Sequence, residues 1–290
     1  MLFSPYIFAW AFGNKKDHTI HSLSNCCDLN LKSVTLAFLV SDRYEEILQW
    51  KEDIAKHRNS INVRLSIGGA MGKIKAPQET CEEAGRKIAS LIEQLEFIRS
   101  IDLDIEGESL TNVETVSQWC AIIEEVVRSC KYDLSFTLTL PVEFEGGMNK
   151  DALHAVNSFM RCKSITVNTV NLMLMDFYTP LEKGKSWAQK HIEILNYVHD
   201  HQLSPMGLSW SNMGICPMIG TNDDKTKFTL KDWDQVTDFA ITRKIALISF
   251  WALNRDRKLG WLQSICGIDG YSKCQDKDFA YANTILHKLQ

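Results

Sequence analysis

Three carboxylic acids alternate with aliphatic residues near the middle of the chain. In the run 101–106 the acids are Asp102, Asp104 and Glu106, and the residues between them are isoleucine or leucine. Successive side chains of a β-strand point to opposite faces, so the three acids share one face and the aliphatic side chains share the other. Carboxylates crowded on one face repel one another unless they share protons, and such coupled groups are suited to acid–base chemistry.

The simpler interpretation of this pattern is a surface strand whose charged face meets solvent. Two observations oppose it. No lysine or arginine is interleaved with the acids, and an amphipathic helical pattern precedes them, with Ile88, Leu91, Ile92 and Leu95 spaced as on one helix face. A covered strand that carries functional acids is therefore the favoured interpretation.

The rest of the chain alternates between short apolar runs and amphipathic segments. The apolar runs predict eight strands, at 6–10, 33–40, 63–67, 101–106, 134–140, 169–176, 214–219 and 245–251. The amphipathic segments predict helices at 44–57, 77–96, 111–129, 151–159, 186–200, 230–241 and 278–289. Strands and helices in turn, without a linker or a short repeat, indicate an α/β chain folded as one (β/α)8 TIM barrel, and a doubly wound open sheet is the second choice.

A barrel would bring the polar ends of several strands together. Active sites of this fold lie at the carboxyl-terminal mouth of the barrel, and the three acids would lead up to that mouth. Three other predicted strands also end in polar or aromatic residues, namely Ser66, Asp176 and Trp251. No Gly-x-Ser-x-Gly turn is present, which argues against a serine nucleophile, so Ser66 is expected to brace Asp102 instead.

Composition limits the classes of function. Of the 290 residues, 45% are hydrophobic and 23% are charged, as in ordinary globular domains, and the net charge of −4 favours neither nucleic acid nor an anionic membrane as a partner. The longest clean apolar run, 34–40, is much shorter than a bilayer span. The start of the chain lacks the pattern of a signal peptide, so the chain is either cytosolic or the mature part of an exported protein.

Cysteine and histidine spacings predict neither a disulfide framework nor a metal site. Nine cysteines are an odd number, which leaves at least one thiol free in a monomer, and a bridge between Cys266 and Cys274 stays open. The two local histidine pairs, beginning at His18 and His199, lack the second half of a metal site and are interpreted as polar loop residues. We expect no metal and no cofactor.

An ordered set of motifs resembles glycoside hydrolase family 18, the chitinase family. The matching segments are similar to the family's D-x-D-x-E core (101–106), the S-x-G-G segment of its third strand (65–69), its sixth-strand motif ending in Asp (171–176) and its eighth-strand tryptophan (249–251). The segments 214–223 and 251–256 resemble the compact bacterial chitinases in particular. These matches follow one another in the family's order, so the resemblance covers the whole chain.

The resemblance implies one catalytic barrel over residues 1–290 and a chitinase, which cleaves β-1,4-N-acetylglucosamine linkages inside chitin and chitooligosaccharides. In the family's substrate-assisted retaining mechanism, Glu106 would be the general acid and later the general base. The acetamido oxygen of the substrate would attack the anomeric carbon and form an oxazolinium. Asp104 would orient the acetamido N–H, and Asp102 would share a proton with Asp104.

The resemblance also implies residues that bind the sugar. Asp176 would hold the acetamido group, and Trp251 would form the apolar floor of the −1 sugar site. The full set of expected substrate-binding residues is Asp176, Trp251, Tyr178, Tyr6, Met173 and Asn222. A core position is favoured over a sugar platform for four other tryptophans, because tryptophan is highly buried in globular domains: Trp187, Trp210, Trp233 and Trp261.

Two positions depart from the family pattern. The longer family motif begins Asp-Gly where this chain has Arg99 and Ser100, and we expect only a structural adjustment there. The family's sixth strand carries a tyrosine directly before its Asp, whereas this chain has Met175. Tyr178 is the candidate for supplying the missing hydroxyl.

Two other functions remain open at this stage. An endo-β-N-acetylglucosaminidase acting on N-glycans would use the same machinery, and a non-catalytic lectin-like relative would bind chitin without cleaving it. Non-catalytic members of the family commonly lose the glutamate that Glu106 matches, so an enzyme is favoured. The expected partner is chitin or an N-acetylglucosamine oligosaccharide, with no role for nucleic acid or a membrane. We expect a secreted monomer, because chitin is extracellular, and a cytoplasmic enzyme is the alternative.

Overall fold

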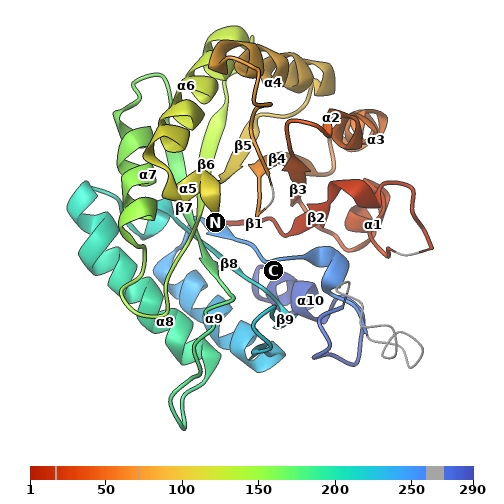
Figure 1. The fold of residues 1–290 in the computed structure, drawn as a ribbon. Helices are drawn as coiled ribbons and strands as arrows, with labels where there is room; N and C mark the ends of the chain where they lie inside the picture. Colours follow the sequence, from red (N-terminus) through yellow and green to blue (C-terminus); the bar gives the residue numbers. More distant parts are fainter. Residues whose placement is uncertain (17, 71, 259–270) are drawn as a thin grey trace.

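Parallel strands form the centre of the molecule, and helices surround them (Figure 1). The computed structural model describes residues 1–16, 18–70, 72–258 and 271–290. Within these residues, one parallel nine-stranded sheet has the strand order β1-β11-β8-β7-β6-β5-β4-β3-β2. Its strands are β1 (Leu2–Phe3), β2 (Tyr6–Phe8), β3 (Ser33–Leu39), β4 (Asn62–Gly68), β5 (Ser100–Asp104), β6 (Ser135–Pro141), β7 (Val167–Leu174), β8 (Met213–Pro217) and β11 (Leu247–Ile248).

The sheet closes into a barrel because β1 and β2 share one strand position. β1 pairs with β11 on one side, with Leu2 opposite Leu247, and β2 pairs with β3 on the other, with Tyr6 opposite Thr35. Pro5 lies between the two strands, and its carbonyl accepts a hydrogen bond from the N–H of Thr35 at 2.9 Å. Counting β1 and β2 together gives the eight positions of a (β/α)8 barrel, so the predicted fold is confirmed.

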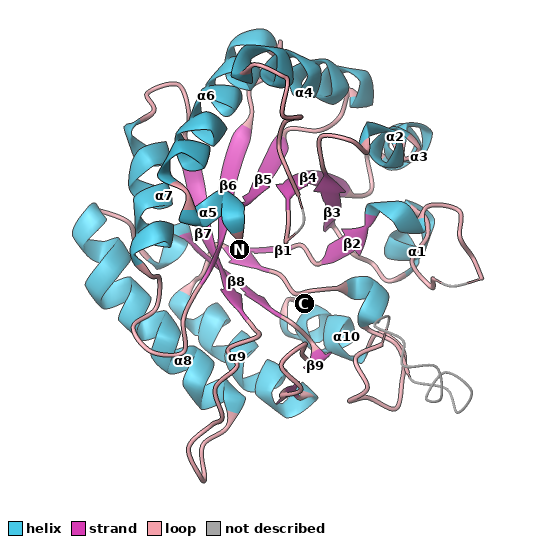
Figure 2. Cartoon of the chain, viewed as in Figure 1, coloured by secondary structure: helices cyan, strands magenta, loops and turns pink. Residues whose placement is uncertain are grey.

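Helices cover the outside of the barrel, as Figure 2 shows. They are α1 (Leu23–Asp28), α2 (Tyr44–Leu48), α3 (Lys51–His57), α4 (Cys81–Leu95), α5 (Glu108–Thr111), α6 (Val113–Ser129), α7 (Lys150–Arg161), α8 (Trp187–Tyr197), α9 (Leu230–Arg243) and α10 (Ala280–Lys288). Side-chain oxygens cap the first backbone N–H groups of α4, α6, α7, α8 and α9, from Thr80, Asn112, Asn149, Ser186 and Thr229. None of the described helices combines the length and the apolar character that crossing a membrane requires.

The observed elements confirm the eight predicted strands and differ mainly at element ends. The predicted helix at 44–57 is divided into α2 and α3, which meet at the buried Trp50. Strand β5 ends at Asp104, so Glu106 lies on the loop that follows. Helix α8 continues into a π-helix, Val198–Leu203. The sequence patterns do not predict α1, α5 or the small hairpin of β9 (Gly220–Thr221) and β10 (Lys227–Phe228).

The apolar core lies between the barrel wall and the helices. On β5 the aliphatic residues of the alternating run, Ile101 and Leu103, are almost completely buried and belong to this core. Helix α4 contributes Ile88 and Ile92 from its apolar face. Burial of such side chains is the main favourable term in folding, at about 25 cal/mol for each Å² of apolar surface. The alternation read from the sequence therefore separates a packing face from a functional face.

The inside of the barrel is polar. Side chains of alternate strands form layers of four in a barrel. The strand register gives three successive layers, from the amino-terminal end upward: Ser4, Arg64, Thr137 and Gly214; Thr35, Asp102, Asn171 and Ser249; Tyr6, Ser66, Thr139 and Cys216. All of these residues are buried, and none is leucine, isoleucine or valine. Hydrogen bonds rather than aliphatic packing therefore fill the barrel.

Truncating the packing face of β5 tests this division of roles. We expect Leu103→Ala to lower the free energy of unfolding by about 2–5 kcal/mol, because it leaves a cavity in the core between barrel and helices. Val113→Ala is the matched control, since Val113 is 58% exposed, and it should change stability by less than about 0.5 kcal/mol. Urea unfolding measures both values. Equal losses in the two variants would contradict the location of the core.

Candidate active site

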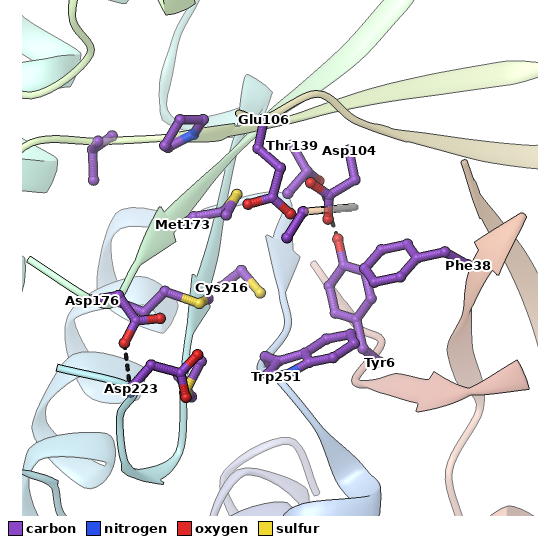
Figure 3. Close-up of a pocket in the computed structure, with 15 residues that line it drawn as sticks. Tyr6, Phe38, Asp104, Glu106, Thr139, Met173, Asp176, Cys216, Asp223 and Trp251 are labelled. Carbon is purple, nitrogen blue, oxygen red and sulfur yellow. Dashed lines mark hydrogen bonds between the residues drawn. The ribbon is translucent and has the colours of Figure 1, made fainter. Parts of the chain in front are cut away.

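A cavity of about 430 Å³ opens at the carboxyl-terminal mouth of the barrel. Figure 3 shows two groups of acids on different sides of it, Glu106 with Asp104 and Asp176 with Asp223, and the aromatic rings of Tyr6, Phe38 and Trp251 on a third side. The residues that line it are Tyr6, Phe38, Ala70, Asp104, Glu106, Thr139, Pro141, Val142, Met173, Met175, Asp176, Cys216, Met218, Asp223 and Trp251. The acidic strand therefore ends inside a concave site.

Asp102 lies below this cavity, inside the barrel, and is completely buried. Three hydroxyl groups donate hydrogen bonds to its carboxylate: Tyr6 at 2.8 Å, Ser66 at 2.6 Å and Thr139 at 2.6 Å. The side-chain amide of Asn171 donates in turn to Thr139 at 3.1 Å. Three hydroxyl groups from three strands therefore satisfy this buried carboxyl group.

Asp104 and Glu106 face each other in the cavity (Figure 3). Burial, together with the charges of Glu106 and Asp102, raises the pKa of Asp104 well above its usual range. Burial also raises the pKa of Glu106 to about 7, while the interaction with Asp104 lowers it and the charge of Asp176 raises it. The pair is thus suited to hold a proton near neutral pH, as a general acid must.

One oxygen of Asp104 has no partner. Its Oδ1 is buried and accepts no hydrogen bond from any described residue. The resemblance implies that Asp102 and Asp104 share a proton. In the described part of the chain no hydrogen bond joins these two carboxyl groups, and Asp102 accepts hydrogen bonds from the three hydroxyl donors instead. An unpaired buried acceptor costs about 1–3 kcal/mol, so Asp104 is ready to accept an N–H from a bound molecule.

Asp176 stands across the cavity from Glu106, directly after β7. Its backbone is in the left-handed region, with φ of 52°, which aspartate tolerates better than most residues. Its Oδ1 accepts the backbone N–H groups of Asp223 at 2.7 Å and of Asp224 at 3.3 Å. Burial and the neighbouring charge of Asp223 raise the pKa of Asp176. The turn after β8 therefore fixes the position of this carboxyl group.

Trp251 forms an aromatic floor together with neighbouring rings. Its ring lies parallel to Phe38, with centroids 5.3 Å apart and an interplanar angle of 16°. It also contacts Phe8 and Tyr6, at centroid distances of 5.2 and 5.8 Å. Because Trp251 is held from three sides and still lines the cavity, it presents a rigid apolar surface of the kind that a sugar ring stacks on.

Four sulfur-containing side chains form the wall between Glu106 and Trp251. Met173 on β7 pairs in register with Cys216 on β8, and Met175 and Met218 follow two residues later on the same face. Burial raises the pKa of the Cys216 thiol well above its usual range, so the thiol stays neutral. This wall is apolar and polarisable.

The structure brings most of the predicted residues together. Glu106, Asp104, Asp176, Trp251, Tyr6 and Met173 line the cavity, and Asp102 lies beneath it. Tyr178 and Asn222 do not line it. Tyr178 is 75% exposed, so its hydroxyl does not replace the one missing at Met175. Asn222 is buried, and its amide bonds to the carbonyls of Met218 and Gly220, so it braces the loop after β8.

The sequence interpretation misses several lining residues, notably Phe38, Thr139, Cys216, Met218 and Asp223. The alternation within each strand is a usable signal for Thr139 and Cys216, because both fall on the inward face near the end of their strands. No pattern in the sequence indicates Asp223 as a lining residue, since its position depends on the turn that holds Asp176.

Other residues singled out in the sequence lie away from the cavity. Arg99 stacks on Tyr132 at 3.5 Å, at the start of β5, in agreement with a structural adjustment. Trp187 and Trp233 are buried in the core, and Trp210 stacks on His199. Trp261 and Cys266 lie outside the described residues, so the bridge to Cys274 is not tested. The described residues contain no cluster of three or more histidine, cysteine or acidic side chains arranged to hold a metal ion.

Comparisons with known proteins agree on the fold. No family model and no curated protein sequence matches the chain. Among solved structures, the catalytic domain of a hyperthermophilic chitinase from Pyrococcus furiosus has a TM-score of 0.77 at 23% identity, over 99% of this chain and 94% of that one. Catalytic-site mutants of active domain 2 of the chitinase from that organism, complexed with chito-oligosaccharides, give the same values. The catalytic domain of a family GH18 chitinase from the fern Peteris ryukyuensis has a TM-score of 0.58 at 14% identity, over 100% and 99% of the two chains. The chain has the fold of these catalytic domains.

The raised pKa of Glu106 predicts a pH-dependent stability. Between its usual value of 4.5 and about 7, the folded state holds a proton that the unfolded state releases. This contribution is complete below pH 4.5 and is lost as the pH rises through 7, and it amounts to roughly 3 kcal/mol. We expect Glu106→Gln to remove it, so that the variant gains stability over the wild type between pH 5 and pH 8. Urea unfolding at both pH values measures this.

Glu108→Gln is the control for this measurement, because Glu108 is exposed and lies outside the cavity. It should keep the pH dependence of the wild type. If Glu106→Gln also kept that dependence, the proton held on Glu106 near neutral pH would be ruled out.

Proposed function

We propose that the protein is a glycoside hydrolase of family 18 that cleaves chitin and chitooligosaccharides, as a single catalytic barrel over residues 1–290. The observation that carries the proposal is the facing pair of Glu106 and Asp104 at the mouth of the barrel, where burial raises the pKa of both carboxyl groups. The fold, which the chain has in common with chitinase catalytic domains, supports the same conclusion.

Glu106 acts as the general acid. Its pKa is raised to about 7, so a large fraction of the molecules keep its proton near neutral pH, and it lines the cavity where a glycosidic oxygen would lie. Donating its proton to that oxygen lets the leaving sugar depart as a neutral alcohol. The resulting carboxylate then accepts a proton from the incoming water, so one residue serves both halves of the reaction.

Asp104 orients the nucleophile, which is the acetamido oxygen of the substrate itself. The unpartnered Oδ1 of Asp104 accepts the acetamido N–H, and this turns the acetamido oxygen towards the anomeric carbon. As the oxazolinium forms, positive charge develops on the acetamido nitrogen, so the hydrogen bond to Asp104 strengthens in the transition state. Such differential stabilisation is what accelerates a chemical step.

The opposite side of the cavity binds the sugar. Trp251 supplies a flat apolar surface for the face of the ring, and Met173 with the other sulfur-containing residues contacts the acetamido methyl group. Asp176 holds the acetamido group from the far side, where the backbone of Asp223 fixes it. Tyr6 contributes through its hydrogen bond to Asp102. A P. furiosus structure with chito-oligosaccharides supports this substrate class.

The proposal extends to an extracellular enzyme, because chitin is an extracellular polymer, and to a monomer. An endo-β-N-acetylglucosaminidase acting on N-glycans and a lectin-like binder are the two competing functions. Both would use the same cavity, so the products of the reaction distinguish them.

Product analysis tests the proposal. We expect the wild type to shorten chitooligosaccharides and to leave an N-glycan intact, while Glu106→Gln loses at least about 10²-fold in turnover because no other group protonates the leaving oxygen. Mass spectrometry of the products, with Glu108→Gln as an active control, measures this. Cleavage of the glycan alone would establish the competing enzyme, cleavage of neither would favour the lectin, and near-wild-type turnover by Glu106→Gln would refute the role of Glu106.

The pH profile tests the coupling of the two acids. Because Glu106 must be protonated to act, kcat/KM should fall as the pH rises through about 7. Asp104→Asn removes the carboxyl group whose pKa is coupled to that of Glu106, so the alkaline limb of the profile should change its position while turnover drops. A profile that keeps its position in Asp104→Asn would show that the two carboxyl groups titrate independently.

A further inference from the structure

A serine, a histidine and an aspartate form a hydrogen-bonded array on the outside of the barrel. Ser24 belongs to α1, and Asp53 and His57 lie one turn apart on α3. The Oγ of Ser24 lies 3.1 Å from Nε2 of His57, and Nδ1 of His57 lies 3.0 Å from Oδ1 of Asp53. None of the three residues lines the cavity at the mouth of the barrel. They therefore form a cluster of their own, separate from the proposed glycosidase site.

The acceptors around the imidazole of His57 decide which of its nitrogens carries the proton. Two acceptors lie beside Nδ1, because the backbone carbonyl of Asp53 is 2.9 Å away in addition to the carboxylate oxygen. In the neutral imidazole the proton is therefore on Nδ1, and Nε2 accepts the hydrogen bond from the hydroxyl of Ser24. The other carboxylate oxygen of Asp53 accepts the backbone N–H of Leu23 at 2.6 Å, which fixes the carboxylate. Serine, base and orienting acid thus follow one another as nucleophilic catalysis requires.

Ser24 lines a surface cavity of about 560 Å³, which is large enough for a small organic molecule. Ser24 is only partly buried, so a molecule that enters the cavity meets its side chain. The ring of Phe12 gives this cavity an apolar contact for a short acyl chain, and the cations of Lys15 and Lys56 line it as well. Negative charge that develops on a bound carbonyl group is therefore formed near two positive charges.

The side chain of Asn25 offers a hydrogen bond to an oxyanion formed beside Ser24. Its Oδ1 accepts the backbone N–H of His21 at 3.2 Å and the hydroxyl of Ser22 at 3.0 Å. These two bonds hold the amide group by its oxygen and leave its NH2 group as a donor at the cavity that Asn25 lines. Asparagine amides are among the donors that stabilise the oxyanions of acyl transfer. The cluster therefore has the nucleophile, the base and a donor for the oxyanion.

We propose that this cluster is a second catalytic site, which hydrolyses esters of short carboxylic acids, with Ser24 as the nucleophile, His57 as the base and Asp53 as the positioning residue. The Oγ of Ser24 attacks the carbonyl carbon while its proton passes to Nε2 of His57. The bond between this carbon and the alcohol oxygen then breaks, and His57 gives its proton to the departing oxygen. Water repeats these steps on the acyl-serine, which releases the acid and restores Ser24. The net reaction converts an ester and water into an acid and an alcohol, and it does not depend on the proposed glycosidase function.

Covalent labelling of the wild-type protein tests for the nucleophile without any substitution. A fluorophosphonate reacts with an activated serine, forming an oxygen–phosphorus bond and releasing fluoride, and mass spectrometry of the peptides identifies the modified residue. We expect the adduct on Ser24, because the hydrogen bond to His57 activates its hydroxyl. Absence of an adduct on Ser24 would overturn the proposal.

Ester turnover gives the second readout, measured as p-nitrophenol release from p-nitrophenyl acetate and corrected for spontaneous hydrolysis. We expect Ser24→Ala to lose at least about 10²-fold in kcat/KM, because it lacks the nucleophile. Asp53→Asn should lose a similar factor in kcat with little change in KM, as expected of a residue that orients the base. Ser117→Ala is the control, since it removes an exposed serine hydroxyl from α6, and it should keep the wild-type rate.

The outcomes separate catalysis from a structural link between α1 and α3. Wild-type protein that releases no p-nitrophenol above the spontaneous rate, or a rate that Ser24→Ala leaves unchanged, would show that the hydrogen bonds only hold the two helices together. If Ser24→Ala fails to fold by circular dichroism, the adduct in the wild type and the turnover of folded Asp53→Asn or His57→Gln decide instead. An adduct on Ser24 together with loss of turnover supports the site, and the lack of either overturns it.

Discussion

A carboxylate buried inside the barrel is the constraint on which the rest of the site depends. Asp102 has no access to solvent, so every interaction that water would give it has to come from the protein. Tyr6, Ser66 and Thr139 supply three hydroxyl donors from three different strands. These strands must therefore keep their register to within a fraction of a residue, and the position of Asp104, two residues further along β5, follows from it.

The same constraint agrees with the absence of leucine, isoleucine and valine from the three barrel layers that the described strands form. Hydroxyl, amide and charged groups around a buried carboxylate leave no room for Val, Ile or Leu, which fill most barrels of this type. Stability then has to come from the outer core, where Leu103 and the apolar faces of α4 and α6 are buried. One strand serves both purposes, because its alternate residues face the two sides. The polar interior and the apolar shell are two consequences of a single alternating pattern.

Most of the fold follows from local patterns, whereas the site follows only in part. Apolar runs and helical spacing identify the eight strand positions of the barrel but not the separate strand β1, and the alternation of acids gives the inward face of β5. Asn222 shows the limit, because its side chain bonds to carbonyls of its own loop and to the backbone N–H of Asp176 and does not line the cavity. Tyr178 shows the same limit, because its own backbone is left-handed, with φ of 51°, and its side chain is exposed. In the sequence, Arg64 looks like an ordinary polar residue of a strand. The barrel layer to which it belongs is defined only by the strand register of the closed sheet.

The unpartnered oxygen of Asp104 connects this architecture to catalysis. A buried acceptor without a donor costs the free protein about 1–3 kcal/mol. The folded barrel keeps this oxygen of Asp104 unpaired, because Asp102 is held in place and cannot move to provide a partner. A ligand that brings an N–H into the cavity recovers that free energy, whereas a sugar with a hydroxyl at the same carbon must offer a differently placed donor. In the proposed function, the group that the network below the cavity leaves unsatisfied would favour an acetamido sugar. Selectivity and catalysis would then share one cause, since the hydrogen bond that selects the acetamido group would also strengthen as its nitrogen becomes positively charged.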